Sequence, residues 1–82
     1  MNQEMRILTF GIVKEITGSP SISIVLPPQA TVTELMQHLK GLYPELNRLK
    51  SLALAINGAY AASDSIITPG DELALIPPVS GG

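Results

Sequence analysis

The sequence predicts an α+β fold in which one main amphipathic helix packs across a mixed sheet of four to five strands. Three observations lead to this prediction: a capped apolar stripe over 31–42, a period-two alternation over 21–26, and an Asn-Gly pair at 57–58 that follows an apolar run. A single amphipathic helix among several strands must lay its stripe on one sheet face. With 82 residues, we expect one domain.

Two strands are expected before the main helix. Met5–Phe10 is rich in residues that suit a half-buried pleated surface. Residues 21–26 alternate polar with apolar side chains until two prolines stop the pattern. Between these strands, Ile12 and Ile16 stand four apart and are flanked by glycines, which fits a short helical turn that covers one end of the sheet. We expect the second strand to pair with the first as a hairpin.

The main helix is expected to begin after Thr31. Thr31 and Glu34 have the spacing of a capping box, in which the hydroxyl accepts from the Glu34 amide and the carboxylate reaches back. The apolar residues that follow recur at intervals of three and four: Val32, Leu35, Met36, Leu39 and Leu42. Segment 44–49 begins with a proline that ends the helix, and we expect a loop or a short helical turn with its two leucines buried beneath it.

The C-terminal half is expected to hold a hairpin and the last strand. The apolar run 52–56 leads into Asn57-Gly58, a strong signal for a two-residue hairpin, and the returning strand follows directly. Residues 63–68 form another short strand or an extended connection, and 72–76 follows a tight Pro-Gly-Asp turn as the last strand. If the first and last strands are parallel central neighbours, the connection order is that of the ubiquitin-like β-grasp.

Composition and charge argue against several classes of function. Hydrophobic residues make up 45% and charged residues 15% of the chain, a balance that builds a core. Five Lys and Arg against seven Asp and Glu leave no basic footprint, so we expect neither nucleic acid nor a membrane surface as partner. With no cysteine and a single histidine, thiol nucleophiles and Cys/His metal clusters are not expected. No apolar stretch or signal sequence suggests export, so the cytoplasm is the expected compartment.

The remaining candidate for chemistry is the main-chain carboxylate of Gly82. We expect 1–76 to form the folded domain and 77–82 to form an extended tail, because its two prolines donate no ladder hydrogen bond and its last two residues have no side chain. Such an end can enter a narrow channel. The Gly-Gly pair alone would also fit a linker remnant or a disordered terminus.

A carboxylate is ionised at neutral pH and is a poor electrophile, so this terminus needs activation. Attack of the carboxylate on the α-phosphate of ATP would give an acyl-adenylate, whose acyl carbon a sulfur donor can attack. The sequence contains no Gly-rich Walker A loop. The activating enzyme is therefore expected to be another protein.

The C-terminal segment 68–82 closely resembles the ending of the MoaD-type sulfur carriers, the small subunits of molybdopterin synthase in the MoaD/ThiS ubiquitin-like family. The specific part is the finish Pro-Pro-Val-Ser-Gly-Gly. Residues 8–18 and 31–42 are more loosely similar to the family's first strand with its helix and to its capped main helix. The resemblance implies a ubiquitin-like β-grasp fold and a non-catalytic, sulfur-donating subunit of a sulfurtransferase that has no active site of its own.

The resemblance also implies a role for the tail. Gly82 would be adenylated by an E1-like ATP-dependent enzyme, converted to a thiocarboxylate, and used to donate sulfur to cyclic pyranopterin monophosphate in molybdenum cofactor biosynthesis. No cofactor would be bound, since the activating enzyme uses the ATP and the sulfur is carried covalently. The second partner would be the large subunit of molybdopterin synthase, in a heterotetramer of two small and two large subunits.

The residues expected to contact these partners lie mostly in the tail: Ile76, Pro77, Pro78, Val79, Ser80 and Gly81. Phe10 either packs in the core or belongs to an apolar sheet face near the tail that would be the natural docking surface.

Three other functions stay open at this point. A thiamine-pathway sulfur carrier also ends in Gly-Gly, although such chains are usually shorter and lack the Pro-Pro-Val stem. A ubiquitin-like protein modifier would use the same terminal glycine to form isopeptide bonds with lysines. A stand-alone binding domain would carry the tail incidentally.

Overall fold

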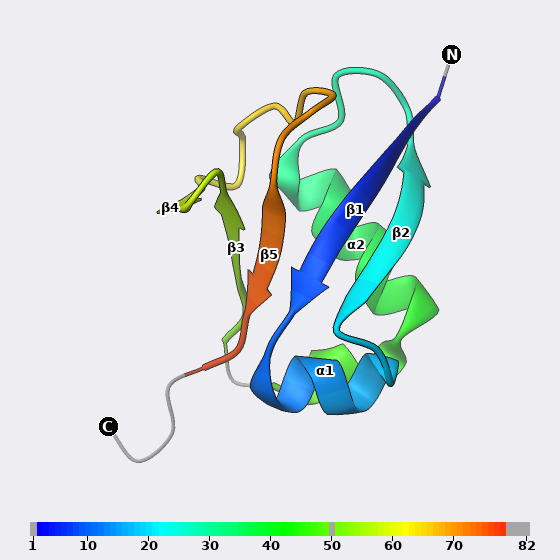
Figure 1. Cartoon of the computed structure of the whole chain (residues 1–82), viewed down its shortest axis with the longest axis vertical. Coiled ribbons are helices and arrows are strands. Elements are labelled where there is room, and N and C mark those ends of the chain that lie inside the picture. The colour runs from blue at the N-terminus through cyan, green and yellow to red at the C-terminus, as the bar shows by residue number, and fades with distance from the viewer. Residues whose placement is uncertain (1, 50, 79–82) are drawn as a thin grey trace.

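A computed structural model of the chain describes residues 2–49 and 51–78. In this part of the chain, a five-stranded sheet is covered on one face by the longer helix, with a shorter helix at one end (Figure 1). The elements are β1 (Gln3–Thr9), α1 (Gly11–Thr17), β2 (Ser21–Leu26), α2 (Val32–Leu42), the 3-10 helix η1 (Pro44–Arg48), β3 (Ala53–Ile56), β4 (Ala59–Tyr60) and β5 (Leu73–Ile76). The strand order is β2-β1-β5-β3-β4.

The first and last strands lie side by side in the sheet. β1 and β5 are parallel, with Ile7 opposite Leu73 and Thr9 opposite Leu75, whereas the other strand pairs are antiparallel. This pairing confirms the ubiquitin-like β-grasp topology. Because β1 and β5 are parallel, the chain leaves both strands at the same end of the sheet, where α1 begins (Figure 1).

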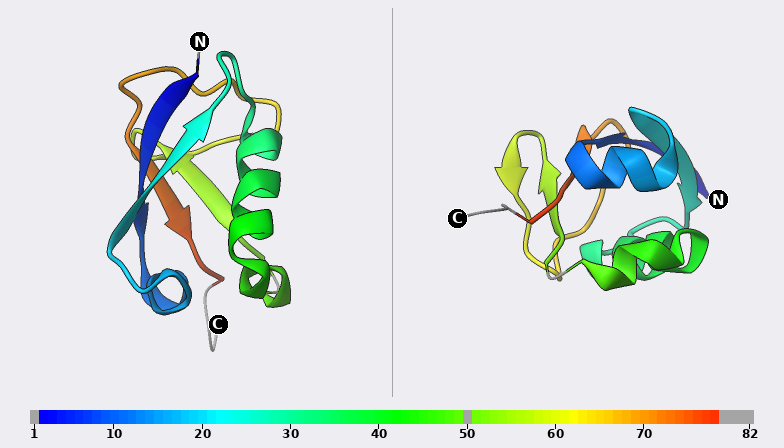
Figure 2. Two further views of the ribbon diagram at one scale, coloured as in Figure 1. Left: turned by 90° about the vertical axis from the view of Figure 1, so that its right-hand side faces the viewer. Right: turned by 90° about the horizontal axis from the view of Figure 1, so that it is seen from below.

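The core lies between α2 and the covered face of the sheet (Figure 2). Leu35 and Leu39 of α2 are fully buried against strand residues such as Ile7 and Leu73. The capping box at Thr31 is confirmed, since its Oγ1 accepts from the Glu34 N–H at 3.3 Å and its N–H donates to Glu34 Oε1 at 3.1 Å. The sequence pattern therefore places the start and the buried face of α2 correctly.

The apolar stripe predicted for the main helix is wrong at its last residue. Leu42 is exposed although it continues the stripe, because α2 ends at this residue and Tyr43 packs against the core instead. The short helical turn predicted between the two glycines is confirmed as α1, and its buried residue is Val13, whereas Ile12 is exposed and Ile16 is half-buried. A seven-residue helix is too short for spacing alone to show which face it buries.

The connection over 63–68 begins with a turn at Ser63 and Asp64 and forms no strand of its own. It makes one isolated bridge, between Thr31 and Ile66, and the Ile67 N–H donates to the Ala30 carbonyl at 2.8 Å. Ile67 is buried, so this connection closes the core beside the start of α2. The expected hairpin at Asn57-Gly58 is confirmed by the antiparallel pairing of β3 with β4.

Candidate functional site

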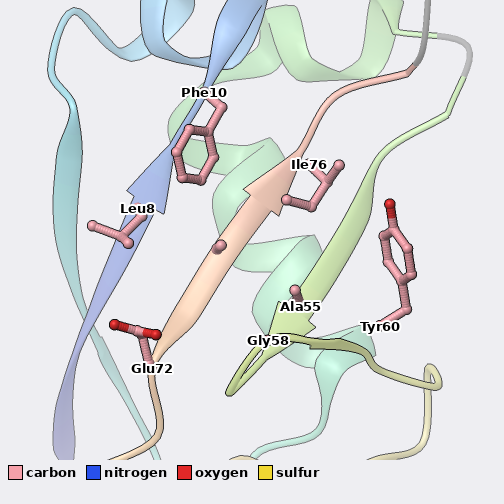
Figure 3. A pocket seen from close by; sticks show the side chains of 8 residues that line it. Leu8, Phe10, Ala55, Gly58, Tyr60, Glu72 and Ile76 are labelled. Carbon is pink, nitrogen blue, oxygen red and sulfur yellow. The ribbon is translucent and has the colours of Figure 1, made fainter.

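The sheet face opposite α2 carries an apolar groove of about 360 Å³ (Figure 3). We call this surface the docking face. Its lining comes from β1, β5, β3, β4 and their ends: Leu8, Phe10, Ala55, Gly58, Tyr60, Glu72, Ala74 and Ile76. These residues alternate along the strands with the buried ones, since successive side chains of a strand point to opposite faces. Glu72 is the one charged residue among them.

The groove follows from a single row of residues across four strands. Leu8 lies opposite Ala74, Ala74 opposite Ala55, and Ala55 opposite Tyr60. The two central positions carry only methyl groups, whereas the positions at both ends carry large side chains. The surface is therefore hollow in the middle of the row.

Phe10 and Ile76 line the same end of the groove, where β5 leads into Pro77 (Figure 3). Phe10 is 47% exposed, so the alternative that it packs in the core is wrong. It directly follows Thr9, which is buried, so the alternation of β1 turns its ring to the open face. The structure thus brings together two residues that the sequence analysis assigned to partner contact.

The stem of the tail begins against the start of α1. Pro77 and Pro78 are half-buried. A Cβ atom at position 11 would lie 3.3 Å from Cγ of Pro77, which is a tight contact. Gly11 also has a φ of 53°, which favours a residue without a side chain. The missing side chain at Gly11 therefore makes room for the proline ring.

Four of the predicted site residues lie outside the described part of the chain: Val79, Ser80, Gly81 and Gly82. Their roles stay predictions, as do those of Ile76, Pro77, Pro78 and Phe10. In the described segments 2–49 and 51–78, no group of three or more His, Asp or Glu side chains could hold a metal ion. No helix within those segments is long and apolar enough to cross a membrane.

Sequence reasoning missed Leu8, Tyr60 and the two alanines of the docking face. Tyr60 lies in the returning strand of the predicted hairpin, and it is 74% exposed. The Asn57-Gly58 signal predicts a two-residue turn, and a turn of that length places Tyr60 opposite Ala55. The sequence therefore does predict this part of the docking face. Placing Leu8 in the same row requires the parallel β1–β5 register, which no local signal supplies.

The fold and this site define a ubiquitin-like β-grasp protein that presents an apolar sheet face beside its C-terminal strand. The chain belongs to the ThiS family, whose family model matches residues 7–82.

Relatives with assigned roles support this placement. The chain is 42% identical to the molybdopterin synthase sulfur carrier subunit of Dictyostelium discoideum, and the match covers 100% of both chains. The crystal structure of SAMP1 from Haloferax volcanii superposes with a TM-score of 0.82 at 32% identity, covering 98% of this chain and 100% of that one.

A complex of subunits 1 and 2 of the molybdopterin-converting factor from Helicobacter pylori contains a chain of the same fold. That chain has a TM-score of 0.66 and 23% identity, and the match covers 98% of this chain and 100% of that one.

Proposed function

We propose that this protein is the sulfur-carrier subunit of a molybdopterin synthase, with the C-terminal carboxylate of Gly82 as the group that carries sulfur. The observation that carries the proposal is the position of the docking face, whose Phe10–Ile76 end adjoins the residues from which the stem departs. A partner that covers this face holds the start of the stem close to its own surface. The 42% identity to a sulfur carrier subunit over the whole chain supports the same function.

In this proposal the docking face binds the partner, and the tail carries the reactive group. The face is apolar and hollow, so a matching convex apolar surface on a partner would bury it and gain affinity. The tail, with two prolines at its base and two glycines at its end, is suited to reach a buried reaction centre. Binding energy from the face would thus be used to position a terminus that binds little by itself.

Two successive steps on Gly82 would load the carrier. First, a carboxylate oxygen attacks the α-phosphorus of ATP on an E1-like adenylating enzyme, and pyrophosphate leaves. Second, hydrosulfide supplied by a sulfur donor attacks the acyl carbon, the bond from that carbon to the adenylate oxygen breaks, and AMP leaves with the electron pair. The product is a thiocarboxylate in which one oxygen has been replaced by sulfur.

In the synthase, the loaded tail would enter the large subunit and give its sulfur to cyclic pyranopterin monophosphate, in an assembly of two small and two large subunits. The thiocarboxylate sulfur would attack a carbon of the pterin side chain and displace an oxygen substituent. Water would then attack the acyl carbon, and the bond between the acyl carbon and the sulfur would break, which leaves the sulfur on the pterin and regenerates the carboxylate. In this proposal, the acids, bases and any metal that these steps need come from the partner proteins, and not from this chain. The chain supplies the sulfur and the surface that positions the loaded tail in the partner.

The test is a reconstitution with the adenylating enzyme, ATP and a sulfur donor, followed by intact-mass measurement. The expected product has one oxygen replaced by sulfur, localised to the C-terminal peptide, and it supports molybdopterin formation once the large subunit is added. A variant that lacks Gly81 and Gly82 should fold as well as the natural chain and form no product. Molybdopterin formation by that truncated variant would contradict the proposal.

A second candidate function is that of a protein modifier. The Haloferax volcanii protein whose structure is 30% identical over 93% of this chain is titled small archaeal modifier protein 1. A modifier would use the same adenylate, but a lysine amine would attack the acyl carbon and form an isopeptide bond. Blots of cells that express a tagged chain separate the two: ladders of tagged conjugates that need Gly82 favour the modifier, whereas a thiocarboxylate without conjugates favours the carrier.

A further inference from the structure

β2 forms one edge of the sheet, and only part of its backbone is bonded to β1 (Figure 1). The Thr9 N–H donates to the Pro20 carbonyl at 3.0 Å. Bonding positions alternate along an antiparallel pair, so every second residue from 22 to 26 bonds to β1. The N–H and C=O groups of the residues between them point away from the sheet. These residues are Ser21, Ser23 and Val25.

Both ends of this outer edge are already closed by the protein itself. The Ser19 hydroxyl donates to the Ser21 carbonyl at 2.7 Å and accepts from the Ser21 N–H at 3.4 Å. Beyond the other end stands Pro27, which has no N–H and whose carbonyl accepts from the Gln3 side-chain amide at 3.2 Å. Among residues 2–49 and 51–78, no hydrogen-bond partner reaches the outward backbone groups of Ser23 and Val25.

We propose that this edge pairs with the β2 edge of a second copy of the chain, antiparallel about a two-fold axis at Ile24. In this register Ser23 of each copy lies opposite Val25 of the other. Four hydrogen bonds then form, and they use each free N–H and C=O once. Ser21 lies opposite Pro27 of the second copy. The Ser19 and Gln3 side chains already hydrogen-bond to the backbone groups of these two residues, so neither residue needs a partner across the interface.

The side chains of the edge favour a second copy over an unrelated peptide. β2 contains no charged residue and no proline, the two features that commonly prevent edge-to-edge pairing. On the open face Arg6 lies opposite Ser23, and Glu4 lies opposite Val25, which is 51% exposed. Each row across the interface would therefore run from Arg6 of one copy to Glu4 of the other.

Each row therefore has an arginine at one end and a glutamate at the other, and the two-fold axis produces two such rows. The charged residues of a row stand on strands three strand spacings, or roughly 14 Å, apart, so like charges at its two ends would disfavour pairing only modestly and mainly at low ionic strength. The docking face uses β1, β5, β3 and β4, so its groove stays open in the pair. One short strand per copy buries little surface, so we expect a weak dimer that forms at high protein concentration.

The experiment is sedimentation velocity and amide NMR of the full chain from tens of micromolar to millimolar concentration. We expect a concentration-dependent dimer, with shifts of the Ser23 and Val25 amides that are larger than those of Ile22 and Ile24. Ser23→Pro removes an outward N–H that β1 does not use, and we expect it to weaken the dimer at least about tenfold. If this variant fails to fold by circular dichroism, Val25→Lys tests the same edge, because a lysine there opposes pairing and lies beside Glu4.

A charge swap provides the matched control. At low ionic strength, Glu4→Arg should weaken the dimer modestly because each row then ends in two arginines, and Glu4→Arg with Arg6→Glu should restore it. A chain that stays monomeric at millimolar concentration would overturn the proposal. So would a dimer that survives both Ser23→Pro and Val25→Lys, or one that is lost with Tyr60→Ala, since the last result would place the contact on the docking face.

Discussion

The side-chain amide of Asn57 donates a hydrogen bond to Oδ1 of Asp71 at 3.1 Å, which ties the turn between β3 and β4 to the turn that leads into β5. Asn57 Oδ1 accepts from the Glu72 N–H at 3.0 Å, and Asp71 Oδ2 accepts from the Thr68 N–H at 2.8 Å. The Asn57 and Asp71 side chains thus fix the end of the docking face that is lined by Glu72 and Gly58.

These bonds predict a loss of stability in acid. The hydrogen bond from the Thr68 backbone N–H has the largest effect and lowers the pKa of Asp71 from its ordinary value of 3.8. Burial opposes it with the next largest effect, and the side chains of Thr68 and Asn57 lower the pKa further. A carboxyl whose pKa is lower in the folded state stabilises the fold above its unfolded pKa, and this contribution is lost as the pH falls through the folded pKa. We therefore expect the free energy of unfolding, measured in urea, to decrease below about pH 3.8.

Asp71→Asn should remove part of this dependence on pH, because the amide cannot lose a proton and accepts hydrogen bonds less strongly. The control is Asp64→Asn, which changes an exposed carboxyl in the preceding connection. The interpretation is wrong if the two variants lose stability in parallel as the pH falls.

A charge placed in the groove should block partner binding without unfolding the protein. Ala74 lies in the centre of the docking face, so Ala74→Arg fills the hollow with a cation that an apolar partner surface cannot accommodate. We expect sulfur transfer in the reconstituted synthase to fall at least about 100-fold, with a cost of a few kcal/mol in binding. The thermal midpoint should change little.

The matched control for that variant is His38→Arg, which adds the same charge to the exposed side of α2, away from the docking face. It should leave both transfer and stability unchanged. Equal activity of the two variants would show that the docking face is not used.

The local parts of this architecture are predictable from sequence because their causes are local. The capping box at Thr31 and the Asn57-Gly58 turn each depend on neighbouring residues, and both appear where the pattern places them. The groove is different because Leu8, Ala74 and Tyr60 come together only through the register of three strand pairs. Alternation shows that Leu8 and Ala74 face outward, but it cannot show that they are neighbours.

Tyr60 is expected to be an anchor of the partner interface. Its exposed side chain borders the hollow, and tyrosine is among the residues that contribute most when buried in an interface. Tyr60→Ala should weaken binding of the large subunit by about 1 to 2 kcal/mol, or about 5- to 30-fold in Kd. The free energy of unfolding should change by no more than about 0.5 kcal/mol, since the residue is at the surface.

Tyr60→Phe separates packing from hydrogen bonding at this position. If the ring fills a partner pocket, the phenylalanine variant keeps most of the affinity. Calorimetric titration with the large subunit measures all three proteins. Unchanged affinity of Tyr60→Ala would move the interface away from β4.

The stem prolines are expected to affect the delivery of the tail and to have little effect on the fold. Pro77 and Pro78 follow β5 directly, and the ring of Pro77 lies against Gly11 at the start of α1. Replacing both prolines by glycine lets the stem adopt more conformations in the free carrier, so ordering the stem in the partner costs about 0.4 to 1 kcal/mol more for each residue. The two costs together correspond to a rate of sulfur transfer about tenfold lower. The loss should appear in single-turnover transfer from the loaded carrier, while urea unfolding stays close to that of the natural chain. A transfer rate unaffected by both substitutions would mean that the partner channel alone orders the tail, and that the prolines only end β5.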